Sequence, residues 1–204
     1  REPMDSMERK KFVRTFMPGI VLFTLSYMLM TTFRDRRDDF SAEIWKSLGY
    51  GDSPEIFTTT EIPVSFAVLI VMGSLVLIKN NKHALMILHL IIFAGMILIG
   101  VSTFLFTRQL IGPTAWMTLI GLGLYLGYVP FNSVFFDRLL AAFKYVGTVG
   151  FVMYIADAFG YLGSVSVMIF KEFVAAKVSW LDFFISSGYI ISGAGSLLIA
   201  GSMI

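Results

Sequence analysis

Six long apolar segments constrain this chain more than any other feature of its sequence. They run over Thr15–Phe33, Ile62–Ile78, Ala84–Thr107, Gln109–Phe136, Tyr145–Phe170 and Phe183–Ile204. A helix needs about 20 mostly apolar residues to cross the roughly 30 Å of hydrocarbon in a bilayer. The second segment reaches that length only if it begins near Ile56. The sequence therefore predicts an all-α membrane protein with six transmembrane helices.

Composition supports a membrane protein and excludes several other classes. Only 15% of the residues are charged, against roughly 25% in soluble domains, and a net charge of +2 is too small to indicate a nucleic-acid partner. The absence of cysteine rules out disulfides, a thiol nucleophile and thiolate metal sites. Neither HExxH nor GxSxG occurs, so we expect no enzyme. His83 and His89 do not share a helix face, so we expect no metal and expect His89 to be a satisfied packing residue; nothing indicates another cofactor.

The distribution of basic residues predicts how the chain is oriented. Nine lysines and arginines fall on the side that carries both chain ends and seven on the other, where acids accompany them. Trp45, Trp116 and Trp180 fall at the opposite ends of the spans, where an aromatic belt is expected. We therefore expect a multi-pass protein of the inner (plasma) membrane with both ends of this segment in the cytoplasm.

The two ends of the chain predict how it is organised. Residues 1–14 are polar and basic, which is typical of a cytoplasmic linker, and residues 15–204 form the predicted six-helix bundle. The chain opens with Arg1 rather than Met and stops at Ile204 inside an apolar segment. We therefore expect a piece of a longer chain, namely its C-terminal half.

One acid lies near the middle of the fifth apolar segment. An isolated carboxylate at that depth costs about 2.5–3.5 kcal/mol, so it is usually paired or faces water. Tyr154, Tyr161 and Ser164 lie at helical spacing beside this residue, Asp157. Two interpretations stay open: a substrate contact or proton carrier facing a central cavity, or a structural carboxylate bonded to a neighbouring helix. In both we expect Asp157 to face the bundle, near Tyr125 and Asn132.

Charged residues follow the first apolar segment without a break. Thr31, Arg34, Asp35 and Asp38 recur every three or four residues, which predicts that residues 31–38 continue the first helix with these side chains on one face. We expect Arg34 to contact a carboxylate, and the three-residue spacing of Arg36 and Asp39 predicts a pair between them. The alternative is a solvated extension of the helix beyond the bilayer.

Further polar side chains lie on the second and fourth segments. Tyr125, Tyr128 and Asn132 share one face of the fourth, where Pro130 should bend the helix. Glu61 lies near the outer entrance of the second. Small residues recur at every fourth position elsewhere, as in Gly188–Ser192–Ser196–Ala200, Gly123–Gly127 and Ala156–Gly160–Ser164, which indicates close helix packing and no chemistry.

Several segments carry a resemblance to a known family. The stretches TTFRDRRDDFSAEIW, IFTTTEIPVS, YLGYVPFNSVFFDRL and GTVGFVMYIADAFGYLGS resemble the C-terminal half of a family of uncharacterised bacterial membrane proteins, itself similar to the major facilitator superfamily. The chain departs from the family pattern at Arg36, where the family has an aromatic residue, and at Asp39, where it has an amide. Between the second and third helices it reads GSLVLIKNNKHA, a degenerate form of the superfamily's Gly/Asp/Arg loop motif. The resemblance implies six helices that pair with an N-terminal six-helix half, or with a second copy, in the bilayer.

Two functions remain open. The first is half of a secondary transporter for a small polar or charged solute, in which two six-helix units rock around a midplane site. The second is a non-transporting assembly or sensor subunit whose polar residues are structural. For the first, the candidate pathway residues are Arg34, Asp35, Asp38, Glu61, Tyr125, Tyr128, Asn132, Asp157 and Tyr161.

Overall fold

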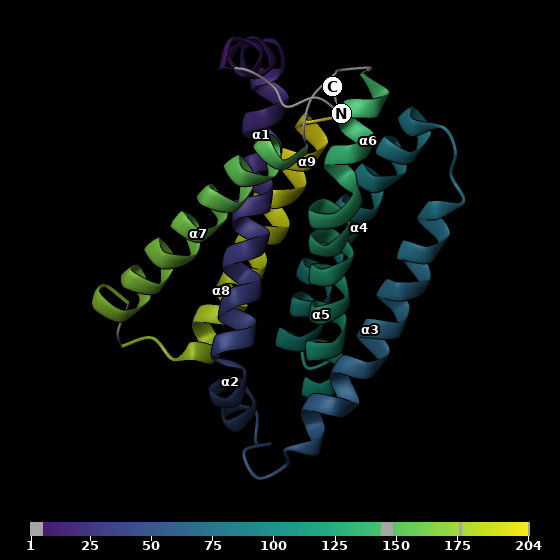
Figure 1. The fold of residues 1–204 in the computed structure, drawn as a ribbon. Coiled ribbons are helices and arrows are strands. Elements are labelled where there is room, and N and C mark those ends of the chain that lie inside the picture. The colour runs from purple at the N-terminus through teal and green to yellow at the C-terminus, as the bar shows by residue number, and fades with distance from the viewer. Residues whose placement is uncertain (1–5, 144–148, 176, 204) are drawn as a thin grey trace.

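The computed structural model describes residues 6–143, 149–175 and 177–203, which form helices and no strand within these ranges. The α-helices are α1 (Ser6–Asp39), α2 (Ser41–Ser47), α3 (Glu55–Val76), α4 (Asn81–Thr107), α5 (Pro113–Pro130), α6 (Phe136–Ala142), α7 (Val149–Phe173), α8 (Trp180–Ile190) and α9 (Ser196–Gly201) (Figure 1). Two π-helical segments, η1 (Phe131–Phe135) and η2 (Ile191–Gly195), join α5 to α6 and α8 to α9.

Six of these helical stretches are long and apolar enough to cross a membrane. They are Val13–Asp39, Glu55–Val76, Asn81–Thr107, Pro113–Ala142, Gly150–Phe173 and Trp180–Gly201. The predicted fold class is confirmed: the chain is an all-α, multi-pass membrane protein. Its second span begins at Glu55, which supplies the length that the apolar segment alone lacked. The start of the fifth predicted segment, residues 145–148, lies outside the described residues.

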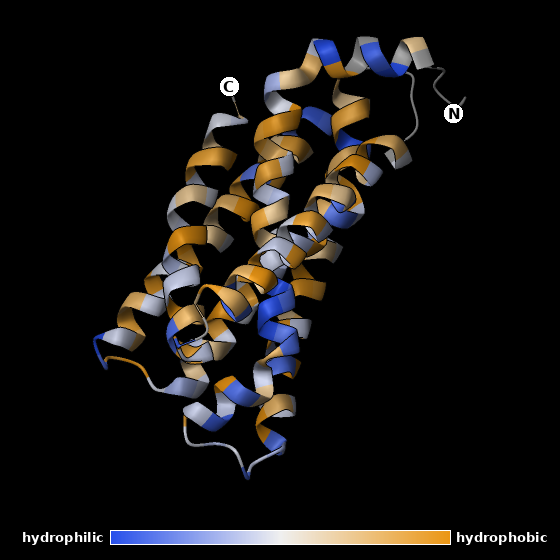
Figure 2. Cartoon of the chain, turned by 90° about the vertical axis from the view of Figure 1, so that its left-hand side faces the viewer, coloured by the Kyte–Doolittle hydropathy of each residue, from blue (hydrophilic) through white to orange (hydrophobic). Residues whose placement is uncertain are grey.

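The first helix bends near the end of the bundle where it begins. Phe16 has non-helical backbone angles (φ −108°, ψ 16°), and Pro18 follows inside the helix. The part before the bend lies across the end of the bundle, and the part after it runs down through the bundle (Figure 2). The sequence predicted a linker over residues 1–14, and the structure shows that this segment is already helical from Ser6.

The fourth span passes its proline without a break. Pro130 has no backbone N–H to donate and would leave a carbonyl without a partner in a regular helix. After Pro130 the backbone forms a π-helical turn over Phe131–Phe135 and then returns to α-helix in α6. Such turns are a common way to absorb an irregularity inside a long helix.

The six spans form two triplets that run in opposite directions. The first triplet is α1, α3 and α4, and the second is α5–α6, α7 and α8–α9. The first span of each triplet packs along the second span of the other, α1 on α7 and α5 on α3 (Figure 1). The third spans, α4 and α8–α9, also pack on each other. This helix order and contact pattern is what two inverted three-helix repeats would produce.

Glycines allow these helices to approach closely, as the small-residue pattern predicted. A Cβ on Gly123 of α5 would lie 2.6 Å from the carbonyl oxygen of Gly95 on α4. On α7, a Cβ on Gly160 would lie 3.1 Å from the hydroxyl of Thr31 on α1. Backbones in membrane bundles come this close only where a side chain is missing or small.

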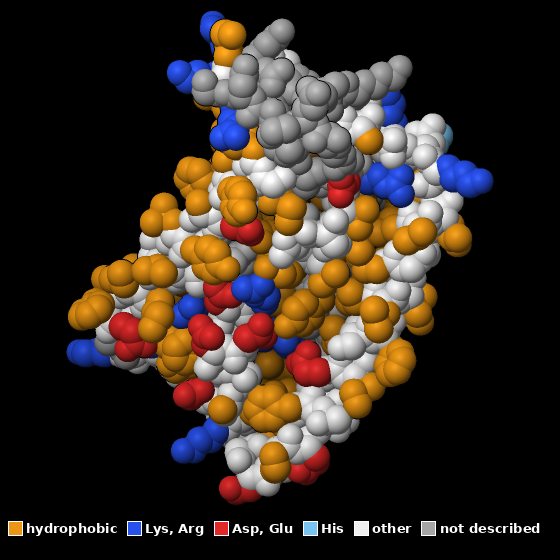
Figure 3. Space-filling view, viewed as in Figure 1, with side chains coloured by type: hydrophobic (Ala, Val, Ile, Leu, Met, Phe, Trp, Pro, Cys, Tyr) orange, Lys and Arg blue, Asp and Glu red, His pale blue; other side chains and the backbone are white. Residues whose placement is uncertain are grey.

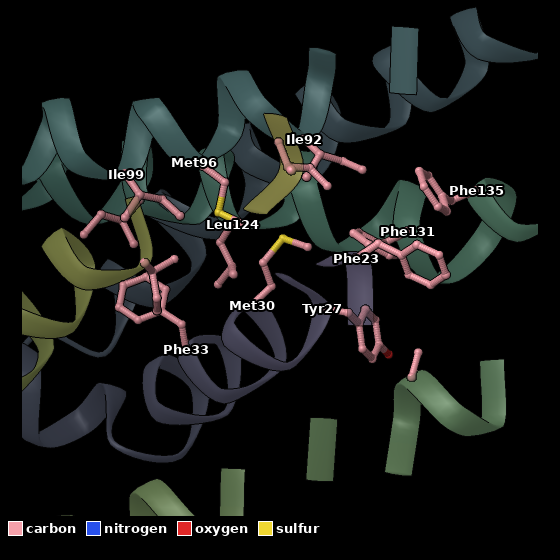
Figure 4. Packing of buried hydrophobic residues seen from close by; sticks show 14 of the residues in the cluster. Phe23, Tyr27, Met30, Phe33, Ile92, Met96, Ile99, Leu124, Phe131 and Phe135 are labelled. Carbon is pink, nitrogen blue, oxygen red and sulfur yellow. The ribbon is translucent and has the colours of Figure 1, made fainter. Parts of the chain in front are cut away.

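Aromatic side chains fill the centre of the bundle. Phe23 of α1 packs edge-on against Phe135, with ring centroids 5.7 Å apart, and Phe131 stacks on Phe135 (Figure 4). Trp116 is fully buried and stacks on Phe106 at 4.0 Å, and Trp45 is almost fully buried too. The predicted aromatic belt is therefore wrong for these two residues, because their rings pack inside the bundle instead of facing the membrane surface.

Candidate functional site

Charged and phenolic side chains gather on one face of the bundle, over α1 and α5 and between α7 and α3. Figure 3 shows acidic and basic side chains clustered there, with hydrophobic surface on both sides. We call this surface the polar face. Its members are Tyr27, Arg34, Asp35, Arg37 and Asp38 of α1, Glu61 of α3, Tyr125, Tyr128 and Asn132 of the fourth span, and Asp157 of α7.

Asp157 is half-buried and turns toward α1. Its carboxylate accepts a hydrogen bond of 2.7 Å from the hydroxyl of Tyr27. The Tyr27 hydroxyl lies 3.5 Å from that of Tyr128, and the two rings stack at 5.6 Å. Asn132, in turn, donates to the Tyr128 hydroxyl at 3.4 Å. Asp157 faces α1, as the prediction of a bundle-facing carboxylate required, and its contact with Tyr27 leads on to the fourth span; Tyr125, which was expected nearby, contacts another acid instead.

Arg34 joins this chain of contacts to the charged end of α1. Its guanidinium lies over the ring of Tyr128, 4.4 Å from the centroid, and donates to Asp35 at 2.7 Å. Residues 31–38 are helical and continuous with the first span, and Arg34 contacts a carboxylate, as predicted. Its partner is the adjacent Asp35, whereas Asp38 turns toward α5 and accepts from the Tyr125 hydroxyl at 3.2 Å.

Arg37 was not among the candidate residues, yet it connects three spans. Its side chain is buried between α1, α5 and α3, where it forms an ion pair with Glu61, lies 3.7 Å from Asp38 and approaches the ring of Tyr125. The guanidinium passes over Gly121, where a Cβ would lie only 2.7 Å from Nη2. A glycine at this position is what lets an arginine reach across α5 to α3.

Around Arg37, the polar face presents its acids more openly than its base. The Arg37 side chain is 4% exposed, whereas those of its two acidic partners, Asp38 and Glu61, are 44% and 40% exposed. Arg34 and Asp35 are half-buried. A solute that reached this face would meet carboxylate oxygens, tyrosine rings and hydroxyl groups before it met the Arg37 guanidinium.

A second buried arginine faces α7. Arg36, 4% exposed, donates to Ser164 at 3.1 Å and to Asp39 at 3.2 Å, and its guanidinium also lies near the ring of Phe40. The spacing of Arg36 and Asp39 predicted their pairing. The sequence placed neither residue in the site, and both lie outside the contacts that lead to Asp157.

Among the described residues, Tyr161 forms no side-chain hydrogen bond with the polar face. Its side chain is 65% exposed although it lies one helical turn from Asp157. The buried side of α7 carries Ala156, Gly160 and Ser164, and Tyr161 is turned about 100° from Gly160 around the helix. Helical spacing correctly placed Tyr161 one turn from Asp157 along α7. It could not show which side of α7 is buried, and Tyr161 lies on the exposed side.

Metal-binding groups do not gather on the polar face. In the part of the chain that the structure describes, no three His, Asp or Glu side chains lie close enough together to hold a metal ion. Its acids are instead engaged with arginines and tyrosines. The arrangement offers hydrogen bonds, charge and a chain of hydroxyl groups.

Comparison with known proteins yields one match. No curated protein and no solved structure matches the chain. A family model described as a family of unknown function (DUF5690) matches residues 1–204, the whole of it. This six-span chain therefore belongs to the DUF5690 family.

Proposed function

We propose that the chain forms half of a secondary transporter of major facilitator type, which moves a small polar or charged solute by alternating access. Its partner is an N-terminal six-helix half of the same protein or a second copy of this unit. The polar face is the surface that meets the solute, and catalysis is not part of its role. The bilayer is a bacterial inner membrane, with both ends of the segment in the cytoplasm.

One observation carries this proposal: the hydroxyl chain that ends at Asp157. A carboxylate in a membrane span is costly unless it is paired or wet, and such residues commonly mark solute or ion pathways. Tyr27 and Tyr128 bring three spans to this acid on a face that the rest of the bundle leaves uncovered. An acid with a purely structural role needs only one hydrogen-bond partner, and it does not need to lie on an uncovered polar face.

The helix order gives independent support. Inverted three-helix repeats nested within each six-helix half are a feature of major facilitator transporters, whose substrate sites lie near the midplane at the interface between the halves. Here α1 and α5, the equivalent first spans of the two triplets, supply most of the polar face.

A second candidate, a non-transporting assembly or sensor subunit, is favoured by the ion pairs on α1. Arg34, Arg36 and Arg37 each contact an acid within the chain. Paired charges of this kind stabilise a helix interface without any solute. The two functions differ in what the hydroxyl chain does, because only transport requires the polar face to contact a passing molecule.

Uptake by the full-length protein separates the two. Proteoliposomes are screened with radiolabelled amino acids, sugars, organic cations and organic acids, and any solute that accumulates is retested with Tyr27→Phe. This variant keeps the stacked ring and removes only the hydroxyl, so we expect a folded protein with impaired uptake. Phe57→Tyr, on an exposed part of α3, is the matched control and should transport normally. Accumulation of no tested solute, or unchanged uptake by Tyr27→Phe, would favour the subunit role.

A further inference from the structure

A cavity of about 490 Å³ lies away from the polar face, at the end of the bundle where α1 enters. The bend of α1, the start of α4, α6 and the end of the sixth span surround it. Its wall is mostly apolar and includes Phe16, Gly19, Phe23, Leu85, Phe135 and Leu139. A volume of this size is in the range of pockets that bind small molecules.

One buried polar side chain belongs to this apolar wall. His89 of α4 is 6% exposed, and its ring lies 5.0 Å from that of Phe135. Nδ1 lies 2.8 Å from the carbonyl oxygen of Leu85. A carbonyl can only accept, so Nδ1 carries the hydrogen, and in the neutral ring Nε2 is an acceptor.

The Nε2 atom of His89 gives the cavity a preference for a ligand that carries a hydrogen-bond donor. Among the residues that the structure describes, no group donates a hydrogen bond to it. Nε2 is not completely enclosed, but in an apolar wall an acceptor without a partner lacks the hydrogen bond that it would form in water, which costs free energy. A ligand that fills the cavity and brings one donor removes that cost.

We propose that this cavity binds an apolar molecule that carries a hydroxyl group, whose O–H donates to Nε2 of His89. The apolar body contacts the phenylalanine and leucine side chains of the wall. Lys82, which is exposed, stands at the mouth of the cavity. The proposal is independent of transport, because the cavity shares no residue with the polar face.

The chain supplies its own means to close the cavity. Gly19 lies in the wall, and a Cβ built on it meets no atom within 4 Å. Gly19→Leu therefore adds an apolar side chain to the wall of the cavity at a position where its Cβ meets no other atom. Gly193→Leu is the matched control, because Gly193 has the same free space and lies outside the cavity.

The test compares two probes that differ by one hydroxyl, para-hexylphenol and hexylbenzene. The full chain is held in phosphatidylcholine nanodiscs, and binding is measured by equilibrium dialysis against empty nanodiscs, which corrects for uptake into lipid. One neutral hydrogen bond should make para-hexylphenol bind about two- to tenfold more tightly than hexylbenzene. Gly19→Leu should lose both probes, and Gly193→Leu should bind them as the wild type does.

His89→Phe isolates the hydrogen bond. It keeps a ring in the wall, so we expect it to bind both probes with equal affinity. In nitrogen-labelled wild type, the Nε2 resonance should move on addition of para-hexylphenol and stay in place with hexylbenzene. Equal affinity of the wild type for both probes, a preference that survives in His89→Phe, or full binding by Gly19→Leu would each overturn the proposal.

Discussion

The close contact between the Arg37 guanidinium and Gly121 leads to a prediction about the stability of the protein. In Gly121→Ala, the new methyl group would lie 2.7 Å from Nη2 of Arg37, 3.2 Å from its Cζ and 3.3 Å from a methyl group of Val64. The guanidinium is held by Glu61 through the same nitrogen, so it cannot move without weakening that ion pair. We expect Gly121→Ala to destabilise the protein.

The expected change in the free energy of unfolding for Gly121→Ala is the balance of one stabilising and two destabilising effects. Replacing a helical glycine by alanine stabilises a helix by about 1 kcal/mol. Overpacking a buried site costs about 1–3 kcal/mol. Loss of the partner of a fully buried charge costs about 3–5 kcal/mol, and the cost is smaller here because Glu61 is partly exposed. The net expectation is a destabilisation of about 1–3 kcal/mol, which lowers the melting midpoint by several degrees.

Thermal unfolding of the purified protein in nanodiscs measures this effect. Gly73→Ala on α3 is the control, because its Cβ meets no atom within 4 Å, and it should be neutral or stabilising. Adding Gly121→Ala to Arg37→Met should cost much less, since the guanidinium is then absent and only the contact with Val64 remains. If Gly121→Ala raised the melting midpoint as Gly73→Ala does, the close packing of the Arg37 guanidinium against Gly121 would be wrong.

Three further changes test other contacts. Gly95→Ala places a methyl group against the carbonyl oxygen of Gly123, a backbone atom that cannot swing away, so the midpoint in the same assay should fall by more than for Gly121→Ala. Asp157→Asn keeps an acceptor for the Tyr27 hydroxyl and should melt like the wild type, whereas Asp157→Ala leaves that hydroxyl only its longer contact with Tyr128 and should lose about 1 kcal/mol. Lys171→Met replaces a buried ammonium that contacts a tryptophan ring, and it should be neutral or stabilising in chemical denaturation.

The fold could be predicted because a bilayer allows few kinds of structure to span it. Its thickness fixes the length of a spanning helix, so six apolar segments could become little else. The three- and four-residue spacing of Thr31, Arg34 and Asp38 extended the first helix correctly into its charged end. Both are local properties, which a single sequence records directly.

The polar face was only partly predictable because burial depends on distant neighbours. Arg36 and Arg37 are adjacent in the sequence, yet one reaches Ser164 on α7 and the other Glu61 on α3. Their burial requires those partners and Gly121, none of which is near them in the sequence. Single-helix spacing likewise gave no means to tell the buried side of α7 from the exposed side that carries Tyr161.

The cavity beside His89 could not be predicted at all. It exists because α1 bends at Phe16, ahead of Pro18, and because four separate elements leave space between them. The sequence predicted His89 as a satisfied packing residue, and the structure satisfies only Nδ1 among the described residues. A bend angle and an empty volume are properties of assembled helices, which no short motif encodes.

Alternating access is tested most directly by labelling Asn132, which bonds to Tyr128 near the end of the hydroxyl chain. The segment contains no cysteine, so Asn132→Cys in a cysteine-free full-length protein provides a single reactive thiol. A membrane-impermeant maleimide is added to oriented membranes from one side and then, in a separate sample, from the other. Leu69→Cys, at an exposed apolar position in the middle of α3, is the control that should resist the reagent from both sides. We expect the thiol at position 132 to be labelled from both sides, and labelling from neither side would contradict a transport pathway along the polar face.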